Sequence, residues 1–85
     1  MNMNPVTALL TYIRDAYVRI HQMTETMYGD PRGHAVDRIV RAREQLLTGI
    51  KERQQKLDTE FAGWKAQCEN DPALATVRSE IERLI

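Results

Sequence analysis

The sequence predicts an all-α fold, an elongated antiparallel helical hairpin whose long central helix is followed by a short third helix that folds back. Two observations support this prediction. Apolar residues recur at alternating spacings of three and four through most of the 85 residues. The three prolines each follow Asn or Asp, in pairs that begin at positions 4, 30 and 71, and such pairs favour helix starts. No linker divides the chain, so we expect one domain over residues 1–85.

The first predicted helix covers residues 5–28. Asn4 can cap its free amides, and Pro5 has the backbone angle that the first helical position needs. Its apolar seam consists of Val6, Leu9, Ile13, Ala16, Ile20, Met23 and Met27. Val18 falls on the opposite, polar side, so we expect its side chain to be exposed.

A turn over residues 29–33 is predicted to join the first two helices. Gly29 suits the left-handed position that follows a helix, Asp30 can cap the next helix, and Pro31 can occupy its first position. Two amphipathic helices joined by so short a connection are expected to pack antiparallel.

The second predicted helix is unusually long, over residues 31–69, about 58 Å at 1.5 Å per residue. Its seam consists of Val36, Val40, Leu47, Ile50, Leu57, Phe61, Trp64 and Cys68. Arg43 and Gln54 interrupt this seam. Gly49 and Gly63 are predicted to lie opposite the apolar stripe without ending the helix, and a bend near Gly49 is the alternative.

The third predicted helix covers residues 72–84, after a turn at residues 70–72. Its seam consists of Leu74, Val77, Ile81 and Leu84. The predicted lengths of the two outer helices sum to that of the long one, so we expect both to lie end to end along it. Such a monomer is only two helices thick. We therefore expect a homodimer, assembled as a four-helix bundle or coiled coil, to cover the remaining apolar surface.

The composition limits the kinds of partner and the cellular compartment that we expect for this protein. The 12 basic and 12 acidic residues balance, so no global field attracts nucleic acid or an anionic membrane. A single cysteine, Cys68, and the lack of an apolar N-terminal run favour a reduced, cytoplasmic protein. No apolar segment approaches the roughly 20 residues that a membrane span needs, so no membrane partner is expected.

Several side chains are candidates for contacting a protein partner. Met23, Met27 and Tyr28 near the turn can form an adaptable docking tip, although ordinary core packing is the simpler interpretation. Val18 adds an exposed apolar side chain. Arg43, a charge within the apolar seam, either pairs within the chain or contacts an acidic partner.

The start of the long helix is locally basic. Its candidate phosphate contacts are Arg32, His34, Arg38 and Arg41. A solvated helix face is the simpler interpretation, and a nucleic-acid contact is the functional one.

No residue pattern indicates catalysis, a cofactor or a metal. Cys68 has no histidine near it in sequence and is expected to be a small buried hydrophobe. His21 and His34 lack the spacing and the direction that a metal site requires. The sequence therefore predicts a non-enzymatic protein-protein interaction module, such as an adaptor, an assembly chaperone or an inhibitor. A small dimeric nucleic-acid-associated regulator that uses the stripe from Arg32 to Arg43 is the alternative.

Overall fold

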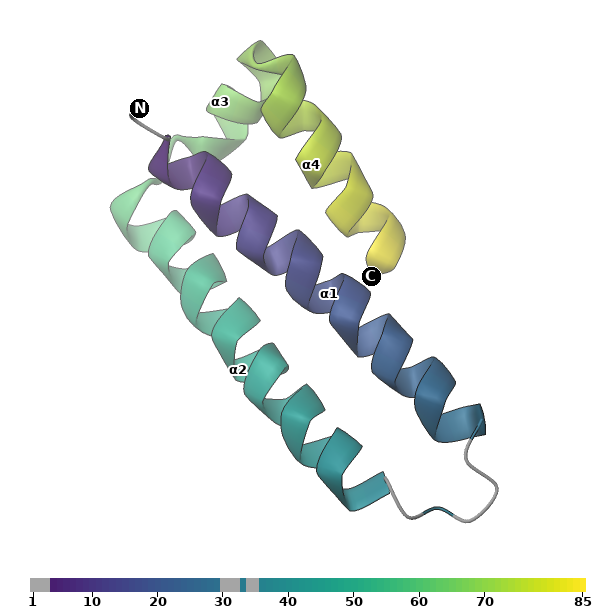
Figure 1. Ribbon diagram of the computed structural model, residues 1–85. Helices are drawn as coiled ribbons and strands as arrows, with labels where there is room; N and C mark the ends of the chain where they lie inside the picture. The colour runs from purple at the N-terminus through teal and green to yellow at the C-terminus, as the bar shows by residue number, and fades with distance from the viewer. Residues whose placement is uncertain (1–3, 30–32, 34–35) are drawn as a thin grey trace.

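The computed structural model describes residues 4–29, 33 and 36–85 (Figure 1). Within these residues the chain forms helices and short connections, without strands. The helices are α1 (Pro5–Gly29), α2 (Val36–Glu60), α3 (Trp64–Asn70) and α4 (Pro72–Leu84). The predicted all-α class is confirmed.

Side-chain caps begin the first and the last helix where the sequence predicts them. The Oδ1 atom of Asn4 accepts a hydrogen bond of 3.0 Å from the amide of Val6. The Oδ1 atom of Asp71 likewise accepts one of 2.9 Å from the amide of Ala73. Each cap satisfies an amide that has no partner within its helix. Asp30 and Pro31, the expected start of the second helix, lie outside the described residues.

The single long helix predicted over residues 31–69 is wrong. α2 ends at Glu60, and α3 begins at Trp64 after a short turn. In this turn the amide of Trp64 donates a 2.8 Å hydrogen bond to the carbonyl of Phe61, and Gly63 precedes the new helix. The chain passes through Gly49 without a break, so the change of direction lies at Gly63 instead of Gly49.

The turn is needed because a straight continuation would carry Trp64 and Cys68 past the start of α1 into solvent. Instead α3 folds across that end of α1, where the side-chain amide of Asn4 donates a 3.2 Å hydrogen bond to Gln67. Trp64 is then 7% exposed and Cys68 is 2% exposed. Burying a tryptophan is one of the largest apolar gains a small domain has.

The helix in the middle of the layer is α1, not the second helix. α1 lies between α2 and α4, and its principal contacts are with both (Figure 1). The expectation that both outer helices lie along the second helix is therefore wrong for α4. The reason is that α3 carries the chain across the end of α1, which leaves α4 on the side away from α2.

The core lies where all four helices come together. Its buried side chains are Val6, Leu10, Ile13, Ala16, Ile20, Ile50, Leu57, Trp64, Cys68, Leu74 and Ile81. We call this part the closed end. α4 reaches only to the level of His21, whose Nε2 atom lies 2.7 Å from the carbonyl oxygen of Leu84. α4 packs on the other side of α1, so among the described helices only α1 has extensive contacts with α2. We call the part of the hairpin that contains residues 36–47 of α2 the turn end.

Candidate interaction groove

Gly49 of α2 contacts the side chain of Tyr12 on α1. A Cβ atom at this position would lie 2.5 Å from the hydroxyl oxygen of Tyr12, so a larger residue would require the exposed end of that side chain to move. The guanidinium carbon of Arg53 lies 4.0 Å from the centre of the Tyr12 ring, which is a cation-π distance. Gly49 is buried and faces α1. The prediction that it lies opposite the apolar stripe is therefore wrong.

The buried face of α2 is consequently rotated from the predicted seam. Ile39 and Leu46 are half-buried, whereas Val40 and Leu47 are each 42% exposed. Arg43, between them on the same stripe, is also exposed. Arg43 therefore does not lie in a buried seam, and the apolar stripe around it faces solvent at the turn end.

This exposed stripe borders an open hollow of about 400 Å³ between α1 and α2. The residues that line it are Tyr17, Leu47, Thr48, Ile50, Lys51 and Gln54. Tyr17 comes from α1 and the others from α2, so the hollow follows the seam between the two helices. We call the hollow together with Val40 and Arg43 the turn-end groove. It is an apolar depression with cationic side chains at its edge.

The cations at this edge form no ion pair within the protein. In the part of the chain that the structure describes, neither Arg43 nor Lys51 has an ion-pair partner, and the same holds for Arg19, Arg38, Arg41, Lys65 and Arg83. The pairs that do form are Arg14 with Asp15 and Glu80, Arg53 with Glu52, Lys56 with Glu60, and Arg78 with Glu82. The groove therefore holds positive charge that the protein itself does not neutralise.

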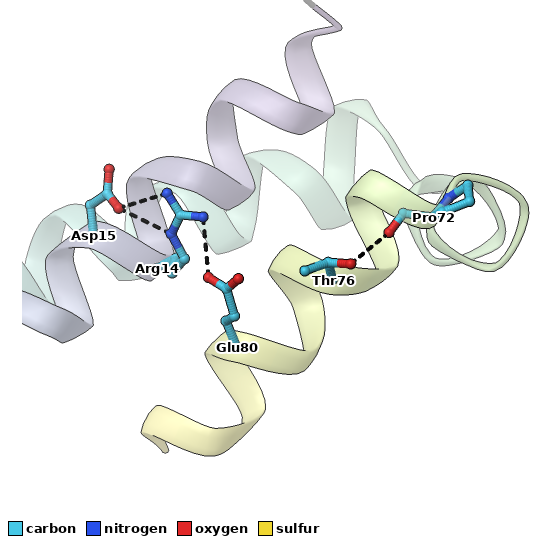
Figure 2. Close-up of polar contacts among 5 residues, drawn as sticks. All are labelled: Arg14, Asp15, Pro72, Thr76 and Glu80. Atoms are coloured by element: carbon cyan, nitrogen blue, oxygen red, sulfur yellow. Dashed lines mark hydrogen bonds and ion pairs between the residues drawn. The ribbon is translucent and has the colours of Figure 1, made fainter.

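Arg14, at the closed end, forms ion pairs within the chain. Figure 2 shows its guanidinium between two carboxylates, 3.1 Å from Asp15 on its own helix and 3.1 Å from Glu80 on α4. The hydrogen bond to Asp15 is the main reason that the pKa of Arg14 is raised. This pair links α1 to α4, so the charge serves the fold and not a partner.

Two of the four predicted phosphate contacts can be placed. Arg38 and Arg41 are exposed and line a second hollow with Asp37, Ala42 and Gln45. A neighbouring hollow shares Ala42 and Gln45 and reaches Arg19 on α1. We call Arg19, Arg38 and Arg41 the basic face. Arg32 and His34 lie outside the described residues.

The predicted docking tip is only partly described. Met23 and Met27 are half-buried, and nothing is described of the side chain of Tyr28. Met23 borders the hollow that contains Leu46, on the side of the basic face. Val18 is 36% exposed on α1. The lining of the turn-end groove includes neither methionine nor Val18, so the structure does not unite the predicted partner-binding residues in one site.

Of the residues considered for catalysis, Cys68 is buried and His21 contacts a backbone carbonyl, while His34 lies outside the described residues. Burial raises the pKa of the Cys68 thiol, which keeps it protonated and unreactive near neutral pH. The Nε2 atom of His21 contacts a backbone carbonyl. Among the described residues, no three His, Cys, Asp or Glu side chains gather as a metal site would require. None of the described helices combines the length and the apolar character needed to cross a bilayer.

Tyr17 belongs to the broad apolar face expected for the first helix, but the sequence assigned neither Tyr17 nor Lys51 to a site. The signal that could have found them is the pair of small residues Ala42 and Gly49, seven positions apart. Small side chains on one helical face allow a second helix to approach closely, and so they mark the face of α2 that contacts α1.

Comparisons with models of protein families, with curated proteins and with solved structures find no match for this chain. The groove and the basic face are therefore the observations from which a function can be argued.

Proposed function

We propose that this protein is a non-enzymatic interaction module that binds a helix in its turn-end groove. The observation that supports the proposal is the exposure of Val40 and Leu47, 42% each, beside an open hollow between two helices. Completing their burial would contribute about 1 kcal/mol each. An apolar groove between helices is the usual receptor for an amphipathic helix.

Two occupants are compatible with such a module. A second copy of the chain would give the four-helix bundle that the sequence predicts, with the turn ends of two hairpins packed together. A helix from another protein would make the chain an adaptor, an assembly chaperone or an inhibitor. In both cases the occupant supplies a layer on the side of the hairpin where the groove lies, whereas α4 packs on the other side of α1.

The experiment compares two exposed valines, one inside the groove and one outside it. Val40→Asp places a charge in the groove, and Val18→Asp places the same charge on α1, where the side chain is 36% exposed. Both variants are expected to keep the wild-type helical circular dichroism, because neither side chain is in the core. Light scattering after size exclusion reports self-association, and titration with a labelled amphipathic helix reports binding of a foreign helix.

We expect Val40→Asp to lower the affinity in whichever assay the wild type is active, by tenfold or more, and Val18→Asp to leave it unchanged. Equal loss in the two variants would contradict the proposal. So would a wild-type chain that is monomeric at millimolar concentration and binds no amphipathic helix.

A second candidate function is supported by the basic face. Arg19 and Arg38 come from different helices, and Arg41 lies beside Arg38 at a hollow that continues toward Arg19. Such an arrangement suits the phosphates of a nucleic acid, as a small nucleic-acid-associated regulator would require. A fluorescent 20-base-pair duplex tests it. Binding at low salt that falls steeply with ionic strength and is lost in Arg38→Glu/Arg41→Glu would support it, and absence of binding at low salt would exclude it.

A further inference from the structure

Building on the proposed function, we infer that the occupant of the turn-end groove is an acidic amphipathic helix of a partner protein. Its apolar residues contact Val40 and Leu47, and its carboxylates contact Arg43 and Lys51. The inference rests on the order of side chains along α2, on the absence of ion-pair partners for the two cations among the described residues, and on the exposure of Val40 and Leu47.

Arg43, Leu47 and Lys51 are spaced by four residues and therefore form one row along the surface of α2. The exposed leucine stands between the two positive charges. The charges are eight residues apart, which is about 12 Å along the helix. A facing helix matches this row when two carboxylates seven or eight residues apart flank an apolar side chain.

No acidic residue of α2 forms an ion pair with this row. None lies three or four positions from Arg43 or from Lys51. Glu44 follows Arg43 directly without pairing with it, and Glu52, which follows Lys51, pairs with Arg53 at 3.4 Å. Asp58, at the far end of the same face, accepts hydrogen bonds from the indole nitrogen of Trp64 at 3.1 Å and from Gln54 at 3.4 Å.

The length of the exposed row fixes the length of the occupant. The part of α2 from Val40 to Lys51 spans about 17 Å at 1.5 Å per residue. A helix of about three turns is long enough to cover it.

A second copy of the chain is the poorer match for the row of Arg43, Leu47 and Lys51, because this row has a cation at each end. If two copies pair about Leu47 with their helices antiparallel, Arg43 of one copy faces Lys51 of the other. If the helices are parallel, Arg43 faces Arg43. Both directions therefore bring like charges together, which disfavours the pairing, whereas an acidic helix removes the conflict.

The test uses two synthetic 21-residue peptides with the same leucine seam. One carries Glu at the positions that flank the seam, and the other carries Lys there. Each is labelled with fluorescein and titrated with the full chain in 50 mM and 300 mM NaCl, with fluorescence anisotropy as the readout. We expect the Glu peptide to bind at least tenfold more tightly than the Lys peptide at low salt, and we expect this preference to shrink at high salt.

Charge-reversal variants test which residues of the protein cause the preference for the Glu peptide. Arg43→Glu/Lys51→Glu is expected to reverse the preference in favour of the Lys peptide. Arg38→Glu/Arg41→Glu introduces the same change of charge on the basic face and is the matched control, which should keep the preference for Glu. Circular dichroism checks that all variants remain helical.

The possible failures are distinguishable. If Leu47→Asp abolishes the binding of both peptides and wild type binds them equally, the module stands and the acidic partner is wrong. If neither peptide binds but the chain dimerises through Val40, the occupant is a second copy and the inference is overturned. If the preference disappears in the Arg38→Glu/Arg41→Glu control, the site lies on the basic face and the inference also fails. Binding that survives Leu47→Asp overturns both proposals.

Discussion

The two ends of α2 carry the same kind of side chain in two different environments. Leu57 at the closed end is fully buried, whereas Leu47 at the turn end is 42% exposed. Both belong to the apolar repeat of one helix, but their side chains project about 80° apart around it. Leu57 is buried in the core with Ile50, whereas Leu47 lies at the edge of the contact with α1, and α4 cannot cover it because α4 lies on the other side of α1 (Figure 1). An amphipathic pattern therefore predicts a broad apolar stripe but not which part of it a neighbouring helix covers.

The two regions also differ in whether their cations form ion pairs within the protein. At the closed end Arg14 connects α1 to α4 through Glu80. In the turn-end groove Arg43 and Lys51 form no ion pair with any of the described residues. Under the proposal above, these two charges are available to a partner.

The largest expected difference comes from truncating the two leucines. Leu57→Ala is expected to lower the free energy of unfolding by about 2–5 kcal/mol, because it leaves a cavity in the core. Leu47→Ala is expected to change it by less than about 0.5 kcal/mol, as for other surface substitutions. Urea titrations followed by circular dichroism at 222 nm measure both values. Equal losses would show that the turn end is covered after all.

The reactivity of Cys68 reports opening of the closed end. Because its thiol is buried and its pKa is raised, Cys68 is expected to react with a thiol reagent only when this end opens. Leu57→Ala is expected to speed the reaction about 30-fold or more, which corresponds to a loss of about 2 kcal/mol, and Leu47→Ala to leave the rate unchanged. The reaction is followed by absorbance at pH 8, with the unfolded chain in urea as the fully reactive control.

The raised pKa of the Cys68 thiol also determines the direction in which the free energy of unfolding changes with pH. The unfolded thiol ionises near pH 8.5, and the buried thiol ionises only at higher pH. The stability of the wild type is thus unaffected by this group below about pH 8.5 and falls as the pH rises through the pKa of the folded state. The chain with Cys68→Ala should lack this part of the alkaline loss in urea titrations at pH 7 and pH 10.

A smaller effect is expected where α1 and α2 approach each other. Replacing glycine by alanine inside an exposed helix usually stabilises it by about 1 kcal/mol. At Gly49 this gain should be cancelled, because the added methyl group would meet the hydroxyl oxygen of Tyr12. Gly49→Ala/Tyr12→Phe should recover part of the gain relative to Tyr12→Phe alone. A full gain in Gly49→Ala by itself would mean that Tyr12 moves away without cost.

The smallest effect belongs to the ion pair that joins α1 to α4. Both side chains are partly exposed, so a double-mutant cycle with Arg14→Ala and Glu80→Ala should give a coupling energy of about 0.2–1 kcal/mol. The coupling should decrease between 50 mM and 500 mM NaCl. A coupling that is larger and independent of salt would indicate that α4 depends on this contact more than on its apolar face.

The positions of the helix starts could be predicted from local chemistry. Asn4 and Asp71 each accept the expected hydrogen bond from an amide two residues later. These caps involve neighbours in sequence, so no tertiary contact is needed to predict them. The turn at Gly63 could not be predicted in this way, because the apolar repeat continues across it through Phe61 and Trp64.

The sequence by itself determined that the chain is helical and where its first and last helices begin, because caps and apolar spacing act over one or two turns. Only the tertiary structure decided which face of α2 is buried, because packing against α1 places Ile39 and Leu46 partly inside and leaves Val40, Arg43 and Leu47 exposed. A broad apolar stripe permits several rotations of a helix, and its contact with the neighbouring helix selects one of them.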